Sequence, residues 1–369
     1  MTTLLTRRHL FGPGPSNCYP QATEALGRPV LGHLDPDFIT ILDSACDSLR
    51  TVWGTNNART LPLSATGSAG MEAAFVNTVS PGNIAVIAVN GLFGERMCEV
   101  ARRCGAEVIR VDHDWGTPID TERVLQAHPS PKVIAAVHAE TSTGVLSDIS
   151  ELGTGKGDAL LIIDAVTSLG GIEVMADEWG IDIGYSGTQK CLGVPPGLSP
   201  FTVSERAFDE RVKDPRSWYL DIGLLGGYVG AAQGTSRTYH HTAPVAMIAS
   251  LEAGLRRILD EGLNNVWARH EAAGRALREG LENMGLQLFA QEGSRLPSLT
   301  TVRVPDSVDS ARVRRHLMEK FSIEIGAGVG RYADSLWRIG TMGPNARPDS
   351  VELVLGALED GLRRSAENP

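Results

Sequence analysis

Tyr185-Ser186-Gly187-Thr188-Gln189-Lys190-Cys191-Leu192-Gly193 is a turn of small residues that leads from an apolar run into a lysine. Upstream of it, the apolar run 160–163 ends in an acid, Asp164. A short helical stretch and a second apolar run separate that acid from the turn. The chain therefore presents a carboxylate and an amine, each following an apolar segment.

One cofactor needs this pair of groups. Pyridoxal phosphate (PLP) needs a lysine amine to hold its aldehyde as a Schiff base, and a carboxylate on its ring nitrogen so that the ring can take up electrons. Each residue alone has an ordinary explanation, because a lysine in a turn is usually solvated and an aspartate after a strand often caps a helix. Lys190 and Asp164 are catalytic candidates because other segments agree with them.

Composition limits the class of protein. The 369 residues are too many for one small core and predict two domains. Hydrophobic residues make up 42% of the chain, which is ordinary for a soluble α/β enzyme. The formal net charge of −10 disfavours binding to nucleic acid and to anionic membranes. An anionic cofactor would therefore depend on local hydrogen-bond donors.

The cysteines and the termini favour a cytoplasmic protein. Five cysteines without the spacing of metal ligands predict free thiols, neither a disulfide framework nor a zinc site. No apolar run approaches the length of a membrane span. The first ten residues are too short and too polar for a secretory signal, and the chain does not end in a peroxisomal address.

Apolar runs alternate with amphipathic stretches over the first two thirds of the chain. This alternation predicts an α/β domain with a mostly parallel sheet covered on both faces. The predicted strands are 85–89, 107–111, 133–137, 160–163, 181–185 and 200–203. The predicted helices are 37–51, 69–79, 95–104 and 119–127.

The pattern changes after about residue 245. Two long helices, 244–259 and 263–284, precede short strands at 298–304, 324–327 and 335–339. This predicts a smaller α+β domain packed against the first. We divide the chain into an N-terminal arm (1–20), a large domain (21–250) and a small C-terminal domain (251–369). The proline and glycine residues within 11–20 exclude a helix or a central strand there.

Three turns after predicted strands or before predicted helices carry further site candidates. Thr66, Gly67 and Ser68 open a helix, where backbone amides and hydroxyls make an anion site, although an ordinary helix cap would look the same. Phe93 follows a strand and could stack on a flat ring, but core packing explains most isolated phenylalanines. Thr141 lies in a Ser/Thr-rich turn that could donate to the phenolate oxygen of PLP.

Two later segments offer charged or polar groups. Tyr239-His240-His241-Thr242-Ala243-Pro244 is dense in donors, and Tyr239 and Thr242 suit a phosphate better than the adjacent histidines suit a metal. We therefore predict no metal site. Arg338 lies between apolar neighbours and needs an anion, either a substrate carboxylate or a structural ion-pair partner.

The chain as a whole resembles the class V aminotransferases of PLP fold type I, in particular the alanine–glyoxylate (serine–pyruvate) aminotransferases. The resemblance runs from Gly12-Pro13-Gly14-Pro15-Ser16-Asn17 to Arg338-Ile339-Gly340. It implies a mostly parallel seven-stranded sheet in the large domain and a homodimer with shared active sites. It also implies ping-pong transfer of an amino group between a small amino acid, alanine or serine, and a 2-oxo acid, glyoxylate or pyruvate.

The resemblance implies a role for each candidate residue. Lys190 would anchor PLP and move the substrate's proton, Asp164 would pair with the ring nitrogen, and Arg338 would bind the substrate α-carboxylate. The remaining residues would hold the cofactor: Val166 and Phe93 on the two ring faces, Thr141 near the phenolate oxygen, Thr66, Gly67, Ser68 and Gln189 on the phosphate, and Tyr239 and Thr242 of the partner subunit on the same phosphate. Better-known members carry Ser-Gly-His where this chain has Thr66-Gly67-Ser68, and often Trp where it has Phe93.

Three alternatives stay open. A desulfurase or another PLP-dependent lyase shares the fold, but a desulfurase usually has histidine before the lysine and a later nucleophilic cysteine, whereas Gln189 precedes Lys190 and no cysteine follows Cys191. A pyridoxamine–pyruvate transaminase would have a degraded phosphate site, which Tyr239 and Thr242 disfavour. A non-catalytic α/β binding subunit would have no need of the lysine, aspartate and arginine together.

Overall fold

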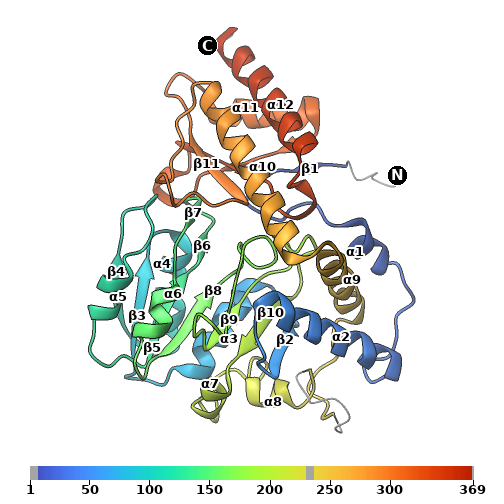
Figure 1. Ribbon diagram of the computed structural model, residues 1–369, viewed down its shortest axis with the longest axis vertical. Coiled ribbons are helices and arrows are strands. Elements are labelled where there is room, and N and C mark those ends of the chain that lie inside the picture. Colours follow the sequence, from blue (N-terminus) through green and yellow to red (C-terminus); the bar gives the residue numbers. More distant parts are fainter. Residues whose placement is uncertain (1–6, 230–236, 368–369) are drawn as a thin grey trace.

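A seven-stranded sheet forms the centre of the computed structural model, which describes residues 7–229 and 237–367 (Figure 1). The strand order is β2-β10-β9-β8-β5-β3-β4, and all pairs are parallel except those of β10, which is antiparallel to both neighbours. The predicted α/β fold with a mostly parallel sheet is therefore confirmed. The strands are β2 (Arg59–Leu63), β3 (Ile84–Val89), β4 (Glu107–Asp112), β5 (Val133–Val137), β8 (Leu160–Asp164), β9 (Ile183–Tyr185) and β10 (Ser199–Val203).

The central strands are almost wholly buried because helices connect them. β5, β8 and β9 are buried at every position, which explains the runs of aliphatic residues 133–137 in β5 and 160–163 in β8. The register places Asp164 beside Val137 on one side and Tyr185 on the other, so three strands end together. The connecting helices are α3 (Gly67–Thr78), α4 (Leu92–Arg103), α5 (Thr121–Gln126) and α6 (Ser150–Gly155), and a short hairpin of β6 (Ala139–Glu140) and β7 (Val145–Leu146) follows β5.

Further helices complete the large domain. α2 packs against β2 and β10, and α9 packs against both α1 and α2. Asp35 caps α2 by accepting from the Asp37 amide, and Gly54 ends this helix in the left-handed region at φ 60°. The bounds are α1 (Pro20–Ala25), α2 (Pro36–Trp53), α7 (Glu205–Asp209), α8 (Ile222–Gly226) and α9 (Val245–Glu261).

A second core belongs to the C-terminal part. Apolar side chains of the helices α10, α11 and α12 pack there against an antiparallel sheet of order β11-β14-β13. Trp337 of this sheet is fully buried. α10 runs from the large domain into this smaller unit (Figure 1). The elements are α10 (Leu263–Asn283), β11 (Leu299–Arg303), α11 (Ser310–Phe321), β13 (Gly326–Ala327), β14 (Leu336–Gly340) and α12 (Pro348–Glu367). The domain limits 1–20, 21–250 and 251–369 stay a prediction.

The N-terminal arm links the two cores. β1 (His9–Leu10) pairs in parallel with β12 (Ile323–Glu324), and the Gly340 amide donates to the Phe11 carbonyl at 2.7 Å. The Ser16 hydroxyl then donates to the carbonyl of Lys190 at 3.0 Å. Residues 9–16 therefore join the small domain to the turn that carries the lysine.

The structure corrects two details of the predicted elements. The predicted strand 324–327 is split, because β12 pairs with β1 whereas β13 pairs with β14. β2 was not predicted, since Pro62 interrupts it. A proline is tolerated there because β2 lies at the edge of the sheet, where one side of the strand needs no donor.

Candidate active site

Lys190 lies in the turn after β9 and is 7% exposed. Its Nζ donates to the carbonyl of Pro13 in the N-terminal arm. Gly14 has φ 110°, a backbone conformation that requires glycine, and a Cβ atom there would lie 2.6 Å from that Nζ and displace the lysine side chain. Burial, reinforced by the positive charge of Arg338, lowers the pKa of Lys190 to about 8.

Asp164 is the last residue of β8 and is buried. Its Oδ1 accepts a hydrogen bond of 2.8 Å from the Val166 amide, and burial raises the pKa of the carboxyl to about 7. Tyr185, its neighbour in the sheet, was not singled out from the sequence. The Tyr185 hydroxyl is buried beside the Asp164 carboxyl, and burial together with that carboxyl raises the pKa of the tyrosine well above the ordinary value.

The start of α3 meets the turn that precedes Lys190. Thr66 is the N-cap residue of this helix, yet its side chain makes no capping hydrogen bond. A Cβ atom on Gly67 would lie 3.0 Å from Val166 and 3.2 Å from the Ser186 carbonyl oxygen, so a side chain at this position would crowd both neighbours. The buried Oε1 of Gln189 has no hydrogen-bond partner among the described residues. Free amides of a helix start, a hydroxyl and a carboxamide form a suitable anion site.

Phe93 and Thr141 lie on the segments that follow β3 and β5. The Phe93 ring has the guanidinium of Arg96 over it at 4.9 Å, and Arg96 also donates to the Ser68 hydroxyl at 3.4 Å. Sequence reasoning missed Arg96, which sits three residues beyond Phe93 on the same helix. Thr141 is buried, and its hydroxyl is 2.6 Å from that of Thr167.

Arg338 lies in the middle of β14 and is half-buried. Its Nε donates to the Ala327 carbonyl at 2.7 Å, and its Nη1 lies 3.5 Å from the Thr141 carbonyl. Within residues 7–229 and 237–367 it has no carboxylate partner, which argues against a purely structural ion pair. Burial disfavours the charged form of this guanidinium and lowers its pKa to about 10. A carboxylate ligand would stabilise the charged form.

Tyr239 and Thr242 lie apart from the other candidates. Tyr239 is 56% exposed, and its hydroxyl is 3.4 Å from that of Thr242, which is also exposed. The rings of Tyr239 and His33 are 5.2 Å apart. No described contact joins either residue to Lys190 of the same chain.

The paired histidines of this segment bond to protein atoms. The Nδ1 atoms of His240 and His241 are 2.8 Å apart, and Nε2 of His241 is 2.6 Å from the Ser64 hydroxyl. Burial lowers the pKa of His241. In the part of the chain that the structure describes, no group of three or more potential metal-ligating side chains comes together.

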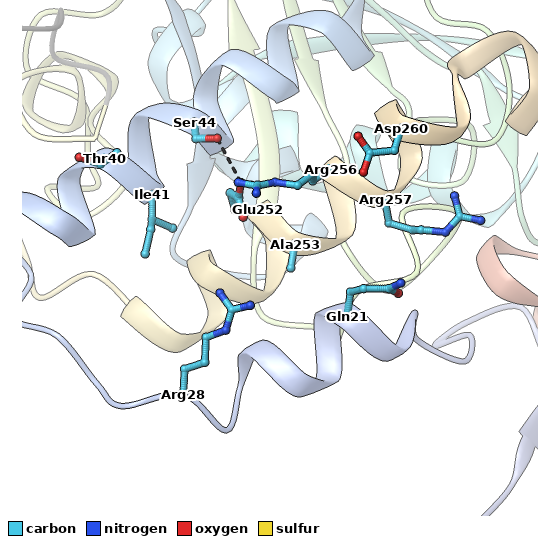
Figure 2. Close-up of a pocket in the computed structure, with 10 residues that line it drawn as sticks. All are labelled: Gln21, Arg28, Thr40, Ile41, Ser44, Glu252, Ala253, Arg256, Arg257 and Asp260. Carbon is cyan, nitrogen blue, oxygen red and sulfur yellow. Dashed lines mark hydrogen bonds and ion pairs between the residues drawn. The ribbon is translucent and has the colours of Figure 1, made fainter.

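A separate pocket of about 370 Å³ lies between α1, α2 and α9 (Figure 2). Its charges are partly satisfied within the protein, since Glu252 accepts from both Ser44 and Arg256. None of the candidate residues lines it, so the site around Lys190 is distinct from this pocket.

The family model for class V aminotransferases matches residues 18–333. The chain belongs to this family. Alanine–glyoxylate aminotransferase of Drosophila melanogaster is 38% identical over 366 residues, which cover 96% of this chain and 92% of that protein. (S)-ureidoglycine–glyoxylate transaminase of Bacillus subtilis is 36% identical over 378 residues, with coverage of 97% and 91%. The crystal structure of alanine–glyoxylate aminotransferase from Nostoc sp. has 43% identity and a TM-score of 0.95, with coverage of 98% and 97%.

This class V aminotransferase is therefore a PLP-dependent enzyme. The geometry of the site fits the cofactor. A buried amine and a buried carboxylate are available at Lys190 and Asp164, and the start of α3, where the Thr66 side chain makes no capping hydrogen bond, lies against the turn that precedes Lys190. Lysine, aspartate and an anion site are the groups that the aldehyde, ring nitrogen and phosphate of PLP require.

Proposed function

We propose that this enzyme transfers the amino group of a small amino acid, alanine or serine, to a 2-oxo acid, glyoxylate or pyruvate. The observation that carries the proposal is Arg338, a half-buried guanidinium with backbone carbonyls as its described partners, linked to the Thr141 segment. Such a group suits the α-carboxylate that amino and oxo acids share. The three relatives reported above are all named for glyoxylate, which favours glyoxylate as the acceptor more than it favours any one donor.

We assign the proton transfer to Lys190. Bound PLP supplies an electron sink for the substrate's Cα. With a pKa near 8, the Lys190 amine is neutral in a large fraction of molecules at mildly alkaline pH and can accept the Cα proton. At the end of β8, the Asp164 carboxyl would be ionised when it pairs with the protonated ring nitrogen, and Val166 lies two residues beyond it, close to the start of α3.

A panel of donors tests the assignment. Alanine, serine and ureidoglycine are offered with glyoxylate or pyruvate as the acceptor, and product amino acids are measured. We expect alanine or serine with glyoxylate to be the fastest pair. Fastest turnover with ureidoglycine would replace the proposed donor, while no turnover with any pair would overturn the substrate assignment.

The same preparation separates the remaining alternatives. Turnover of free pyridoxamine with pyruvate would support a pyridoxamine–pyruvate transaminase, and release of sulfide from cysteine would support a desulfurase. We expect instead a yellow protein whose visible band shifts on addition of alanine.

Arg338→Ala should raise KM for amino and oxo acids alike, because both carry the same carboxylate. The loss of a charged hydrogen bond is worth about 1.5–3 kcal/mol, or roughly ten- to a hundredfold. kcat should also fall if the contact aligns the Cα–H bond. PLP affinity should change little. Kinetics with alanine and glyoxylate check this, and Arg303→Ala on the neighbouring β11 serves as the control.

Unchanged KM values for both substrates would place the carboxylate anchor elsewhere. Arg338 would then act only through its bonds to backbone carbonyls.

We also propose a homodimer in which each site uses residues of both subunits. Exposed aromatic side chains gather near the histidine pair: the rings of Trp218 and His240 are 4.2 Å apart, and those of Tyr219 and His241 are 5.2 Å apart. Large apolar side chains exposed to solvent favour a protein interface. The large hydrophobic side chains that are exposed in this chain include Val30, Leu34, Trp218, Tyr219, Leu224 and Tyr239.

Complementation tests the shared site. A Lys190→Ala chain and a chain with Tyr239→Phe and Thr242→Ala are mixed under conditions of subunit exchange. Each hybrid dimer then holds one intact site, so random mixing should restore about a quarter of wild-type activity. Activity of the mixture no higher than the average of the two separate variants, with hybrids confirmed by mass spectrometry, would indicate self-contained sites.

A cytoplasmic location is part of the proposal. All five cysteines are unpaired, which suits a reducing compartment. No helix among the described residues has the length and apolar character to cross a membrane. Fractionation of the source cells tests the location.

A further inference from the structure

Glu140 is a fully buried carboxylate that the sequence did not single out. It ends β6, at 0% exposure, directly before Thr141. One carboxylate oxygen accepts from the amide and the hydroxyl of Ser142, at 3.0 Å and 2.6 Å. The other accepts from the Phe93 amide at 3.1 Å. All these partners are donors, which is the arrangement that an ionised carboxylate requires.

Glu140 and Ser142 together cap α4, a helix that lacks a capping side chain of its own. The N-cap residue is Gly91, and the Leu92 amide donates instead to the Ser142 hydroxyl at 3.0 Å. A buried carboxylate at a helix start also interacts favourably with the helix dipole. The cap therefore comes from a strand end that is 47 residues away from Phe93 in sequence.

The close approach of the start of α4 to the turn at Glu140 and Ser142 depends on Gly91. A Cβ atom on Gly91 would lie 2.4 Å from the Cγ and Cδ of Glu140 and 2.5 Å from the Ser142 hydroxyl. Because Gly91 has an extended backbone at φ 178°, the requirement is for space and not for an unusual conformation. Any side chain there would displace the carboxylate.

The charge of Glu140 reaches the groups around Lys190. Burial raises the pKa of Glu140 itself, and the hydrogen bonds from Ser142 and Phe93 oppose that shift. Its negative charge acts to raise the pKa of each of three groups, Arg338, Lys190 and Asp164. Glu140 thus contacts the segment that carries Phe93 and directly precedes Thr141. Its charge also affects the pKa values of Lys190, Asp164 and Arg338.

We propose that Glu140 is a positioning residue that fixes Phe93 and Thr141 relative to each other, and so sets how the cofactor ring is seated. The inference rests on the proposed contacts of Phe93 and Thr141 with PLP. It does not depend on which amino acid is the donor.

Glu140→Gln tests the proposal with little change of shape. A carboxamide has one accepting oxygen, so at least one buried amide or hydroxyl of the cap loses its acceptor. We expect PLP affinity to fall roughly tenfold or more, and the visible circular dichroism of the bound cofactor to change in amplitude. kcat should fall more than KM for alanine changes. Glu151→Gln is the matched control, since Glu151 is exposed and accepts only from the Thr121 hydroxyl in the described contacts.

Gly91→Ala supplies an independent test, because it displaces the carboxylate without removing its charge. It should change the circular dichroism and PLP affinity in the same direction as Glu140→Gln. If Glu140→Gln fails to fold, Gly91→Ala and Ser142→Ala decide by the same measurements. Wild-type PLP affinity and circular dichroism in the folded variants would overturn the proposal. Both measurements are made without substrate, so they stand even if the donor panel gives a different reaction.

Discussion

Lys190→Ala is expected to abolish turnover while the protein still folds. Lys190 carries both the covalent attachment of PLP and the proton transfer, and no nearby group can replace both. Its described side-chain contact is a bond to the Pro13 carbonyl, so little structure depends on it. Steady-state assays with alanine and glyoxylate, and the visible spectrum after addition of PLP, measure the effect. Lys132→Ala is the control, because Lys132 pairs with Glu210 far from the site in sequence.

Stability of the cofactor-free protein gives a second measurement for Lys190. The pKa of Lys190 falls from its ordinary value of 10.5 to about 8 on folding, so below pH 8 the buried ammonium costs roughly 3 kcal/mol of stability. Between pH 8 and 10.5 the unfolded chain binds more protons, and stability rises with pH. Lys190→Ala should remove this rise and increase the melting temperature at pH 7. Activity close to that of the wild type would refute the assignment of the lysine.

Asp164→Asn should leave PLP bound but slow amino-group transfer by about a hundredfold or more, the usual cost of losing a preorganised charge. An amide cannot hold the protonated ring nitrogen by charge. The carboxamide oxygen can still accept from the Val166 amide, so the fold should persist. The half-reaction with an amino donor, followed by absorbance, reports the rate. Asp148→Asn is a matched control, since Asp148 likewise accepts from the amide two residues on, but is exposed.

The acid limb of the stability curve tests the same residue. Burial raises the pKa of Asp164 to about 7, so the folded, cofactor-free protein binds a proton that the unfolded chain has released. Stability should therefore fall as pH rises from about 4 to 7, and Asp164→Asn should lack this fall. An unchanged half-reaction rate would mean that another acid serves the ring nitrogen.

The sequence revealed those site residues that follow buried strands. Asp164 ends an apolar run, and Lys190 lies in a turn of small residues, so local pattern was enough to mark both. Arg338 was marked because a charge between apolar residues needs a partner. The structure adds that its described bonds go to backbone carbonyls, which no local pattern could show.

Residues whose role depends on distant segments escaped prediction. Glu140 looks like part of an ordinary Ser/Thr turn, because its partner at Phe93 belongs to another strand–helix connection. Tyr185 was quoted within the lysine stretch, but only the strand register places it beside Asp164. Pro13 and Gly14 gave signals of an ordered loop and no sign that they meet Lys190.

The pairing of β1 with β12 has a consequence for the order of events during translation. The last strand of the seven-stranded sheet ends at Val203, whereas Leu10 bonds to Asn345, which lies 335 positions later in the chain. We expect the large sheet to assemble on the emerging chain while residues 9–10 still lack their partners. The arm that contacts Lys190 can take its final place only when nearly the whole chain has left the ribosome. We therefore expect the contacts around Lys190 to be completed late in synthesis.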